Sequence, residues 1–218
     1  MKRYFVGFIV VVALLGVFIL VFGYTGNFLY EVNDEEIILP VNIYLIKDDT
    51  GTLTTSRDVE DIVSLFKEVN GIWGQGSIMF VVEDVVVDEV AHDDFRGVFL
   101  GDVRYLAEKD ELEKGVMNGY FVKNLDANGM SFPAQGIFLI GDITSVNDYR
   151  TTAHEIGHLL GLVHIEGKEH LMYKGSNGEL LSEEEIGIAR RNAKKFYVLI
   201  GYNFNTFYSL NGALCFLQ

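Results

Sequence analysis

The spacing of three histidines between positions 154 and 164 is the strongest constraint on how this chain folds locally. His154 and His158 are four residues apart, Glu155 follows the first, and the stretch reads H-E-x-x-H-x-x-G-x-x-H. On a helix, a spacing of four places both imidazoles on one face, one turn apart. Gly161 tolerates a left-handed backbone conformation, so the helix can end there and the chain can bring His164 back toward the first two rings.

Imidazoles gathered in this way are typical of a catalytic zinc site. Histidine nitrogens bind Zn²⁺ at about 2.0–2.1 Å, and three protein ligands leave a fourth position for water. The predicted metal ligands are therefore His154, His158 and His164. Glu155 is placed to accept a proton from the activated water rather than to bind the metal.

These residues resemble the signature of the metzincins, a family of zinc endopeptidases, at every fixed position. Metzincins carry a methionine-containing turn beneath the metal, and Leu171-Met172-Tyr173 follows His164 after a short loop. The resemblance implies that Met172 forms the floor of the site without binding zinc, and that proteins or peptides are the substrates. It also implies an α+β (α/β-like) fold, in which a twisted, mostly parallel sheet has an antiparallel edge strand, a long active-site helix and a C-terminal helix.

Other interpretations of the motif stay open. The histidines can be ordinary polar residues of an amphipathic helix. The third ligand can be Glu179 or Glu183 instead of His164. The alternative function is a zinc-containing binding module that does not cleave its partner, although an intact Glu155 argues against it.

The first residues of the chain predict a membrane anchor. Lys2 and Arg3 precede an apolar run over residues 4–23, and about 20 helical residues span the roughly 30 Å of a bilayer core. This run is longer than a signal-peptide core. We therefore expect an uncleaved signal anchor at 1–23, a stem at 24–36, and the rest of the chain outside the cytoplasm. The alternative is a cleaved signal and a secreted protein.

Charge and cysteine content narrow the function classes further. Lys and Arg number 17 against 31 Asp and Glu, a formal charge of −14. This charge argues against nucleic acid as a partner, because phosphate binding requires a basic surface. The lone cysteine, Cys215, excludes an intramolecular disulfide. The sequence does not indicate an oligomeric state.

Residues 37–199 are expected to form the catalytic domain and residues 200–218 an aromatic tail. Strands are expected at 37–46, 77–90, 119–125 and 136–143, and helices at 59–70, 103–114, 149–160 and from 182 onward. Strands that alternate with helices also predict a largely parallel, twisted sheet. The segment 91–97 is expected to be a loop, and the helix at 59–70 to end at Asn70-Gly71. The resemblance places the substrate-binding edge strand between Tyr120 and Ile140. The expected helix caps are Thr55 or Ser56, Asn147 with Asp148, and a Ser182–Glu185 capping box.

Overall fold

The computed structural model describes residues 35–109, 112 and 115–200. The chain divides into two units, Met1–Glu35 and Glu36–Gln218, and the fold below belongs to the second. The predicted anchor at 1–23, nearly all of the predicted stem, and residues 201–218 of the predicted tail lie outside the described residues. Within the described ranges, every helix is too short or too polar to cross a membrane.

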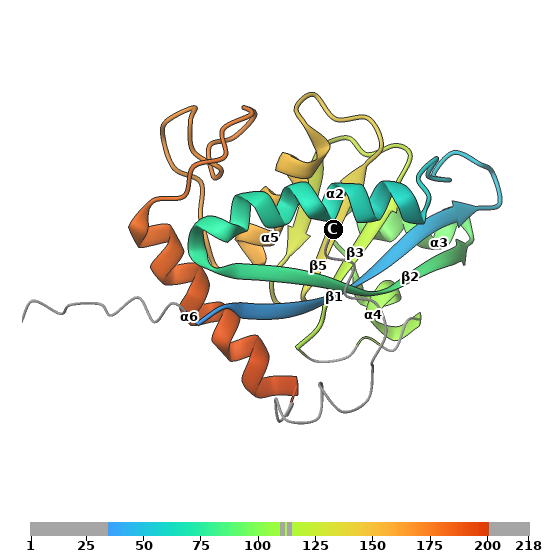
Figure 1. The fold of residues 1–218 in the computed structure, drawn as a ribbon. Coiled ribbons are helices and arrows are strands. Elements are labelled where there is room, and N and C mark those ends of the chain that lie inside the picture. The colour runs from blue at the N-terminus through green and yellow to red at the C-terminus, as the bar shows by residue number, and fades with distance from the viewer. Residues whose placement is uncertain (1–34, 110–111, 113–114, 201–218) are drawn as a thin grey trace, which may run out of the picture. The chain divides into compact units, whose positions relative to one another are not determined.

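A five-stranded sheet forms the centre of the fold, with strand order β2-β1-β3-β5-β4 (Figure 1). Its strands are β1 (Ile37–Asp48), β2 (Ile78–Val90), β3 (Met117–Val122), β4 (Gly129–Phe132) and β5 (Ile137–Gly141). The first four in spatial order run parallel, and β4 pairs antiparallel with β5. Strands β3 and β5 are buried at every position, as is usual for parallel strands covered on both faces. The predicted mostly parallel sheet with an antiparallel edge strand is thus confirmed.

Helices cover both faces of this sheet. The helices are α2 (Val59–Trp73), α3 (His92–Phe99), α4 (Arg104–Lys109), α5 (Asp148–Leu159) and α6 (Glu183–Ile200), and the short 3-10 helix η1 (Gly74–Gly76) follows α2. One apolar cluster joins the sheet to α2, α5 and α6, and a second joins the opposite face to α3 and α4. The predicted C-terminal helix is present, and its capping box holds, with Glu185 N donating to Ser182 Oγ at 3.2 Å.

Helix α2 departs from its predicted ends. Its N-cap is Asp58, which forms a capping box with Asp61, so the predicted cap at Thr55 or Ser56 is wrong. The helix also continues through Gly71 to Trp73, which is fully buried. The predicted stop at Asn70-Gly71 is therefore wrong as well, because burial of the last turn outweighs the helix-breaking tendency of glycine.

The segment expected to be a loop at 91–97 is part of a helix. Helix α3 begins at His92 and buries Phe95 and Val98 against the sheet. These two apolar side chains, three residues apart, lie on one helical face. Of the helix expected at 103–114, α4 covers Arg104–Lys109, and residues 110–111 and 113–114 lie outside the described part.

Candidate metal centre

Helix α5 carries the first two histidines and is embedded in the core. Ile156 and Leu159 are buried in the cluster shared with α2 and α6, and such packing restricts the rotamers of neighbouring side chains. Asn147 is the N-cap residue, but the predicted side-chain cap is absent. Its backbone carbonyl instead accepts from Thr151 N at 3.0 Å, and its side-chain amide donates to Tyr149 Oη at 2.8 Å.

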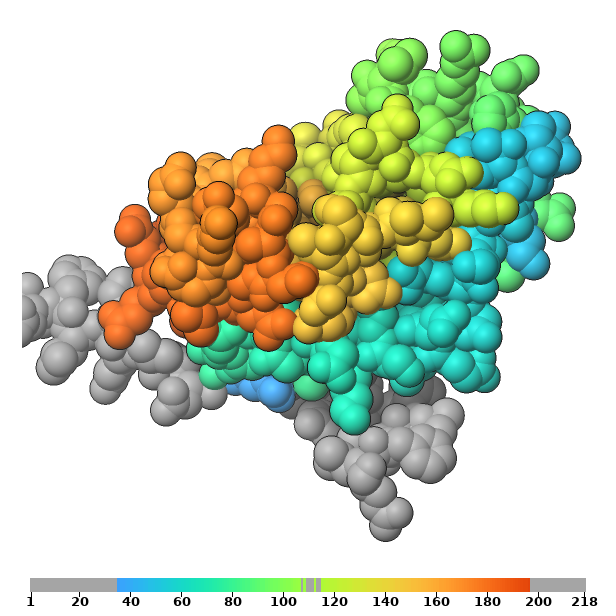
Figure 2. Space-filling model, turned by 90° about the horizontal axis from the view of Figure 1, so that it is seen from above, coloured from blue at the N-terminus to red at the C-terminus, as the bar shows by residue number. Residues whose placement is uncertain are grey.

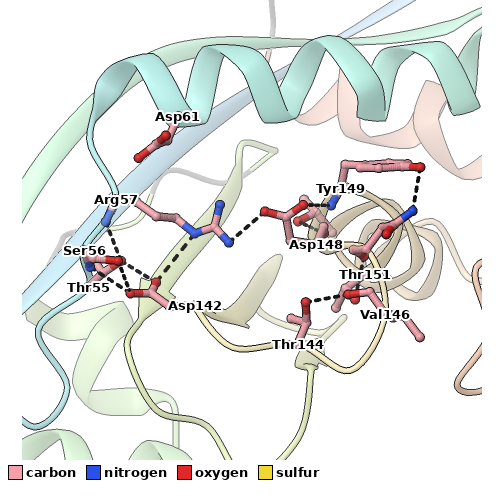
Figure 3. Close-up of polar contacts among 12 residues, drawn as sticks. Thr55, Ser56, Arg57, Asp61, Asp142, Thr144, Val146, Asp148, Tyr149 and Thr151 are labelled. Atoms are coloured by element: carbon pink, nitrogen blue, oxygen red, sulfur yellow. Dashed lines mark hydrogen bonds and ion pairs between the residues drawn. The ribbon is translucent and has the colours of Figure 1, made fainter.

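A polar network anchors the start of α5 (Figure 3). Asp142, just beyond β5, accepts from Thr55 Oγ1 at 2.6 Å and from Ser56 N at 2.7 Å. Arg57 lies between two carboxylates, with Nε 3.6 Å from Asp142 and Nη2 2.9 Å from Asp148. The network joins the residues just before α2, the residue just after β5 and the first residue of α5. It also explains why Thr55 and Ser56 do not cap α2.

The helix ends where the motif requires a bend. Gly161 has φ +81°, a left-handed backbone conformation that residues other than glycine rarely adopt. A Cβ atom there would lie 2.4 Å from Nδ2 of Asn192 on α6. That amide donates to the carbonyl of Leu160 at 2.8 Å, so α6 seals the end of α5. Sequence reasoning identified Gly161 but missed Asn192, which carries no local signal.

The three predicted ligands converge on one point. The Nε2 atom of His164 lies 3.1 Å from Nε2 of His154 and 3.2 Å from Nε2 of His158. Among the described residues, these histidines form the one group of at least three metal-binding side chains, with ligand atoms all within 4.8 Å of one another. His164 thus lies where the third predicted ligand is expected, and no glutamate belongs to this group.

Two of the imidazoles have a defined tautomer. Nδ1 of His154 lies 2.7 Å from the carbonyl of Leu171, and Nδ1 of His158 lies 2.9 Å from the carbonyl of Leu162. A carbonyl only accepts, so each Nδ1 carries the hydrogen and each neutral ring has its lone pair on Nε2. Both lone pairs point at Nε2 of His164, which can donate at most one hydrogen. At least one Nε2 lone pair therefore has no hydrogen to accept, and a bound cation would interact favourably with it.

The spacing of these atoms fits zinc. Tetrahedral ligands at about 2.0–2.1 Å from Zn²⁺ are separated from one another by about 3.3 Å, close to the 3.1 and 3.2 Å found here. Burial lowers the pKa of His154 to about 4, although its hydrogen bond to Leu171 acts in the opposite direction. Burial and nearby positive charges also lower the pKa of His164. Both rings are therefore neutral at pH 7, the form that binds a metal.

Glu155 is a buried carboxylate beside this cluster, with an exposed fraction of 8%. Burial raises its pKa, and a hydrogen bond from the Ser131 side chain opposes that shift. Ser131 belongs to β4, the antiparallel edge strand. A raised pKa in a buried acid next to a metal site suits a group that accepts and returns a proton.

Met172 packs against the underside of α5. It is fully buried, and a Cβ atom on Gly157 would lie 2.6 Å from its Sδ atom. Glycine at 157 therefore makes room for the sulfur on the turn between His154 and His158. The predicted methionine turn thus lies against the helix that carries the first two ligands.

The loop that follows His164 is held to the start of α5 through Asn177 and Glu179. Figure 2 shows this loop, in orange, beside the amber segment that opens α5. Asn147 N donates to Asn177 Oδ1 at 2.8 Å, and Tyr149 Oη donates to Glu179 Oε1 at 2.9 Å. Glu179, considered above as a ligand, is thus engaged away from the histidines.

Sequence reasoning missed Arg150, which is buried on α5 and donates to the carbonyls of Leu171 and Tyr173. A charged residue one turn before His154, on the same helix, was the available signal. The remaining histidines lie apart from the cluster. His92 contacts Asp48 at 3.2 Å, and the His170 ring nitrogens lie 3.9 Å from glutamate oxygens.

No protein-family model matches the sequence, and no curated protein sequence matches it. Solved structures do match the fold. The crystal structure of archaemetzincin from Methanopyrus kandleri has a TM-score of 0.50 at 11% identity, over 73% of this chain and 96% of that chain.

Two further structures match less closely. Metalloproteinase-II from Bacteroides fragilis has a TM-score of 0.48 at 16% identity, over 71% of this chain and 53% of that one. A chain of a chaperone–substrate complex has a TM-score of 0.49 at 14% identity, and the matched region covers 75% of this chain and 35% of that chain. The match to archaemetzincin, at a TM-score of 0.50, shows a similar fold over 73% of this chain.

Proposed function

We propose that this chain is a zinc-dependent endopeptidase. The observation that carries the proposal is the convergence of three imidazole nitrogens, at 3.1 and 3.2 Å, beside a buried carboxylate. An archaemetzincin-like fold supports it. Three histidine ligands with a carboxylate beside them are typical of a catalytic zinc site. A structural zinc site would use four protein ligands.

In this proposal His154, His158 and His164 hold the metal. Zinc bound there would supply Lewis-acid activation of water and of the substrate carbonyl. Glu155 accepts the proton of the attacking water and returns it to the departing amine. Met172 and Gly161 bind nothing themselves, since one supports α5 from below and the other forms the bend that presents His164.

The substrate is proposed to be a protein or peptide lying along β4. This strand is the last of the sheet in the described residues, and its first residue, Gly129, packs against Glu155. An extended peptide paired with β4 by main-chain hydrogen bonds would pass directly over the carboxylate. Pairing of this kind gives affinity with little dependence on sequence.

The test uses the full-length chain loaded with zinc. Glu155→Ala should retain stoichiometric zinc and lose about 10²–10⁴-fold in the hydrolysis of an unstructured protein such as casein, the range expected for an acid–base group. Glu184→Ala, at an exposed position in the first turn of α6, is the matched control and should keep full activity.

Two outcomes would refute the proposal. Full hydrolysis by the Glu155→Ala chain would remove the role assigned to that carboxylate. A wild-type chain that binds zinc but cleaves no member of a broad peptide library would favour the non-cleaving binding module instead.

Location is a separate proposal. Residues 1–23 are proposed to anchor the chain in a membrane, with residues 37–199 forming the catalytic domain outside the cytoplasm; a secreted, cleaved form is the alternative. An anchored chain should resist extraction by alkaline carbonate and should be digested by protease added outside intact cells. An intact mass that lacks the first residues would show the secreted form.

A further inference from the structure

Arg150 joins α5 to the loop that follows the zinc ligands. It lies one turn before His154 and is only 3% exposed. Its Nη2 atom donates to the carbonyls of Leu171 and Tyr173, and its Nε atom donates to the carbonyl of Gly178 at 3.2 Å. One planar guanidinium thus fixes three backbone carbonyls of that loop relative to the helix.

The carbonyl of Leu171 is shared between Arg150 and a predicted metal ligand. It accepts from Arg150 Nη2 and also from Nδ1 of His154, at 2.7 Å. A carbonyl oxygen has two lone pairs, so both are occupied and its direction is determined by the two donors together. Since Arg150 also holds the carbonyl of Tyr173, neither the peptide unit before Met172 nor the one after Tyr173 can rotate freely.

We propose that Arg150 is a positioning residue for the metal site. By holding the Leu171 carbonyl, it fixes the tautomer and direction of the His154 imidazole, so that Nε2 of that ring points at the other two histidines. Residues that hydrogen-bond to a metal ligand and orient it commonly change the metal affinity by about 10–100-fold when they are removed. The expected effects on metal binding rest on the proposed zinc site. The expected effect on the tautomer of His154 does not, because it can be measured without metal.

The positive charge of Arg150, considered alone, predicts an effect on zinc affinity opposite to that of its positioning role. A buried cation near the three histidines repels Zn²⁺, so its removal should strengthen metal binding if charge dominates. If positioning dominates, its removal should weaken binding. Two substitutions separate these effects: Arg150→Lys keeps the charge but lacks the planar fork, whereas Arg150→Met keeps much of the bulk and loses both.

The experiment compares full-length wild type, Arg150→Lys and Arg150→Met by competition with a chromophoric zinc chelator. We expect both variants to bind zinc about 10–100-fold more weakly, the usual loss when such an orienting group is removed. The visible spectrum of the cobalt-substituted chain should change in both, because the His154 ring is no longer held in one direction.

A third readout needs neither metal nor activity. NMR of the imidazole nitrogens in the metal-free chain should show His154 with its hydrogen on Nδ1 in the wild type. In Arg150→Lys the same ring should show a mixture of tautomers, since the Leu171 carbonyl is no longer held.

Arg190 provides a matched control. It is also a buried arginine, 8% exposed, and it donates to two backbone carbonyls, those of Gly76 at 2.5 Å and Ser77 at 3.2 Å. It lies on α6. Arg190→Lys should lower the denaturation temperature, while the zinc affinity stays within about twofold of wild type and the cobalt spectrum and His154 tautomer are unchanged.

The outcomes that overturn the inference are distinct from those that overturn the proposed function. Wild-type zinc affinity and tautomer in Arg150→Lys would overturn it, and so would tighter zinc binding by Arg150→Met. Where Arg150→Met does not fold, Arg150→Lys decides alone. A wild-type chain that binds zinc without cleaving peptides would refute the endopeptidase proposal and leave the role of Arg150 intact.

Discussion

A Cβ atom placed on Gly129 would lie 2.7 Å from Cγ of Glu155, closer than two carbon atoms can pack. Gly129 is the first residue of the edge strand β4, and Glu155 is on α5. The proposed catalytic carboxylate thus lies directly against the backbone of the strand along which we propose that the substrate binds. Glycine at this position is what permits that approach.

Gly129→Ala should therefore lower kcat/KM by about a hundredfold, because a displacement of about 1 Å at a reacting group has that effect. Zinc content should be unchanged, since the substitution does not touch the histidines. Peptide hydrolysis and metal analysis of the same preparation check both points. Gly71→Ala, where an added Cβ meets nothing within 4 Å, is the control, and equal kcat/KM in the two variants would contradict the expectation.

The contact between Gly157 and Met172 should appear as coupling between two substitutions. Gly157→Ala places a methyl group 2.6 Å from the Sδ atom of Met172 and should cost about 1–3 kcal/mol of unfolding free energy through overpacking. Met172→Ala should cost about 2–5 kcal/mol by leaving a cavity. In the double variant the methyl group fills part of that cavity, so the two costs should sum to more than the measured loss, by about 0.5–3 kcal/mol. Urea denaturation of the four chains gives this number, and strict additivity would contradict the packing.

A side chain at position 161 should be unfavourable for two reasons: backbone strain and a steric clash with Asn192. An alanine at φ +81° costs about 1–2 kcal/mol, and its Cβ would also displace the Asn192 amide that binds the Leu160 carbonyl. Gly51→Ala isolates the strain, because Gly51 has φ +72° with nothing within 4 Å of an added Cβ. We expect Gly161→Ala to lose more stability than Gly51→Ala and also to bind zinc more weakly, as His164 moves away. Equal zinc affinity in the two variants would show that the bend tolerates a side chain.

The stability of the metal-free chain should fall as the pH is lowered from about 6.5 to 4. Burial lowers the pKa of His154 to about 4 in the folded chain, whereas an unfolded histidine titrates near 6.5. Between these values the unfolded chain binds more protons, so unfolding becomes easier with acid. The contribution of His154 is about 3 kcal/mol, present in full above pH 6.5 and lost by about pH 4. His164, whose pKa is also lowered, adds to it with the same sign.

Denaturant unfolding of the chelator-treated chain at pH 7 and pH 4.5 measures this loss. In His154→Gln, which cannot titrate, the difference between the two pH values should shrink by about 2–3 kcal/mol. Asp48 contributes little in this window, because an unfolded aspartate begins to bind protons only at about pH 3.9. Burial tends to raise its pKa, but hydrogen bonds from Thr50, Thr54, Leu53 and His92 outweigh burial and hold that pKa well below its usual value. An unchanged pH dependence in His154→Gln would contradict the assignment.

Much of the site was predictable because its determinants are local in the chain. The spacing of His154 and His158 specifies one helical face, and a glycine at 161 specifies where the helix can end. The capping box of Ser182 and Glu185 is equally local, and it is present. Alternating strands and helices predicted the mostly parallel sheet that the structure contains. In each case the physical cause acts within about one turn or one strand, so the order of residues is enough to reveal it.

Tertiary structure alone decided which groups support those residues. Arg150 reaches the carbonyl that orients His154, Asn192 covers the bend, and Gly129 and Gly157 each leave room for one side chain. Helix α3 formed where a loop was expected, because Phe95 and Val98 find a buried face of the sheet. Each of these contacts depends on how elements distant in the chain pack together, and the free energy of such packing is set by shape and burial that no short stretch of sequence contains.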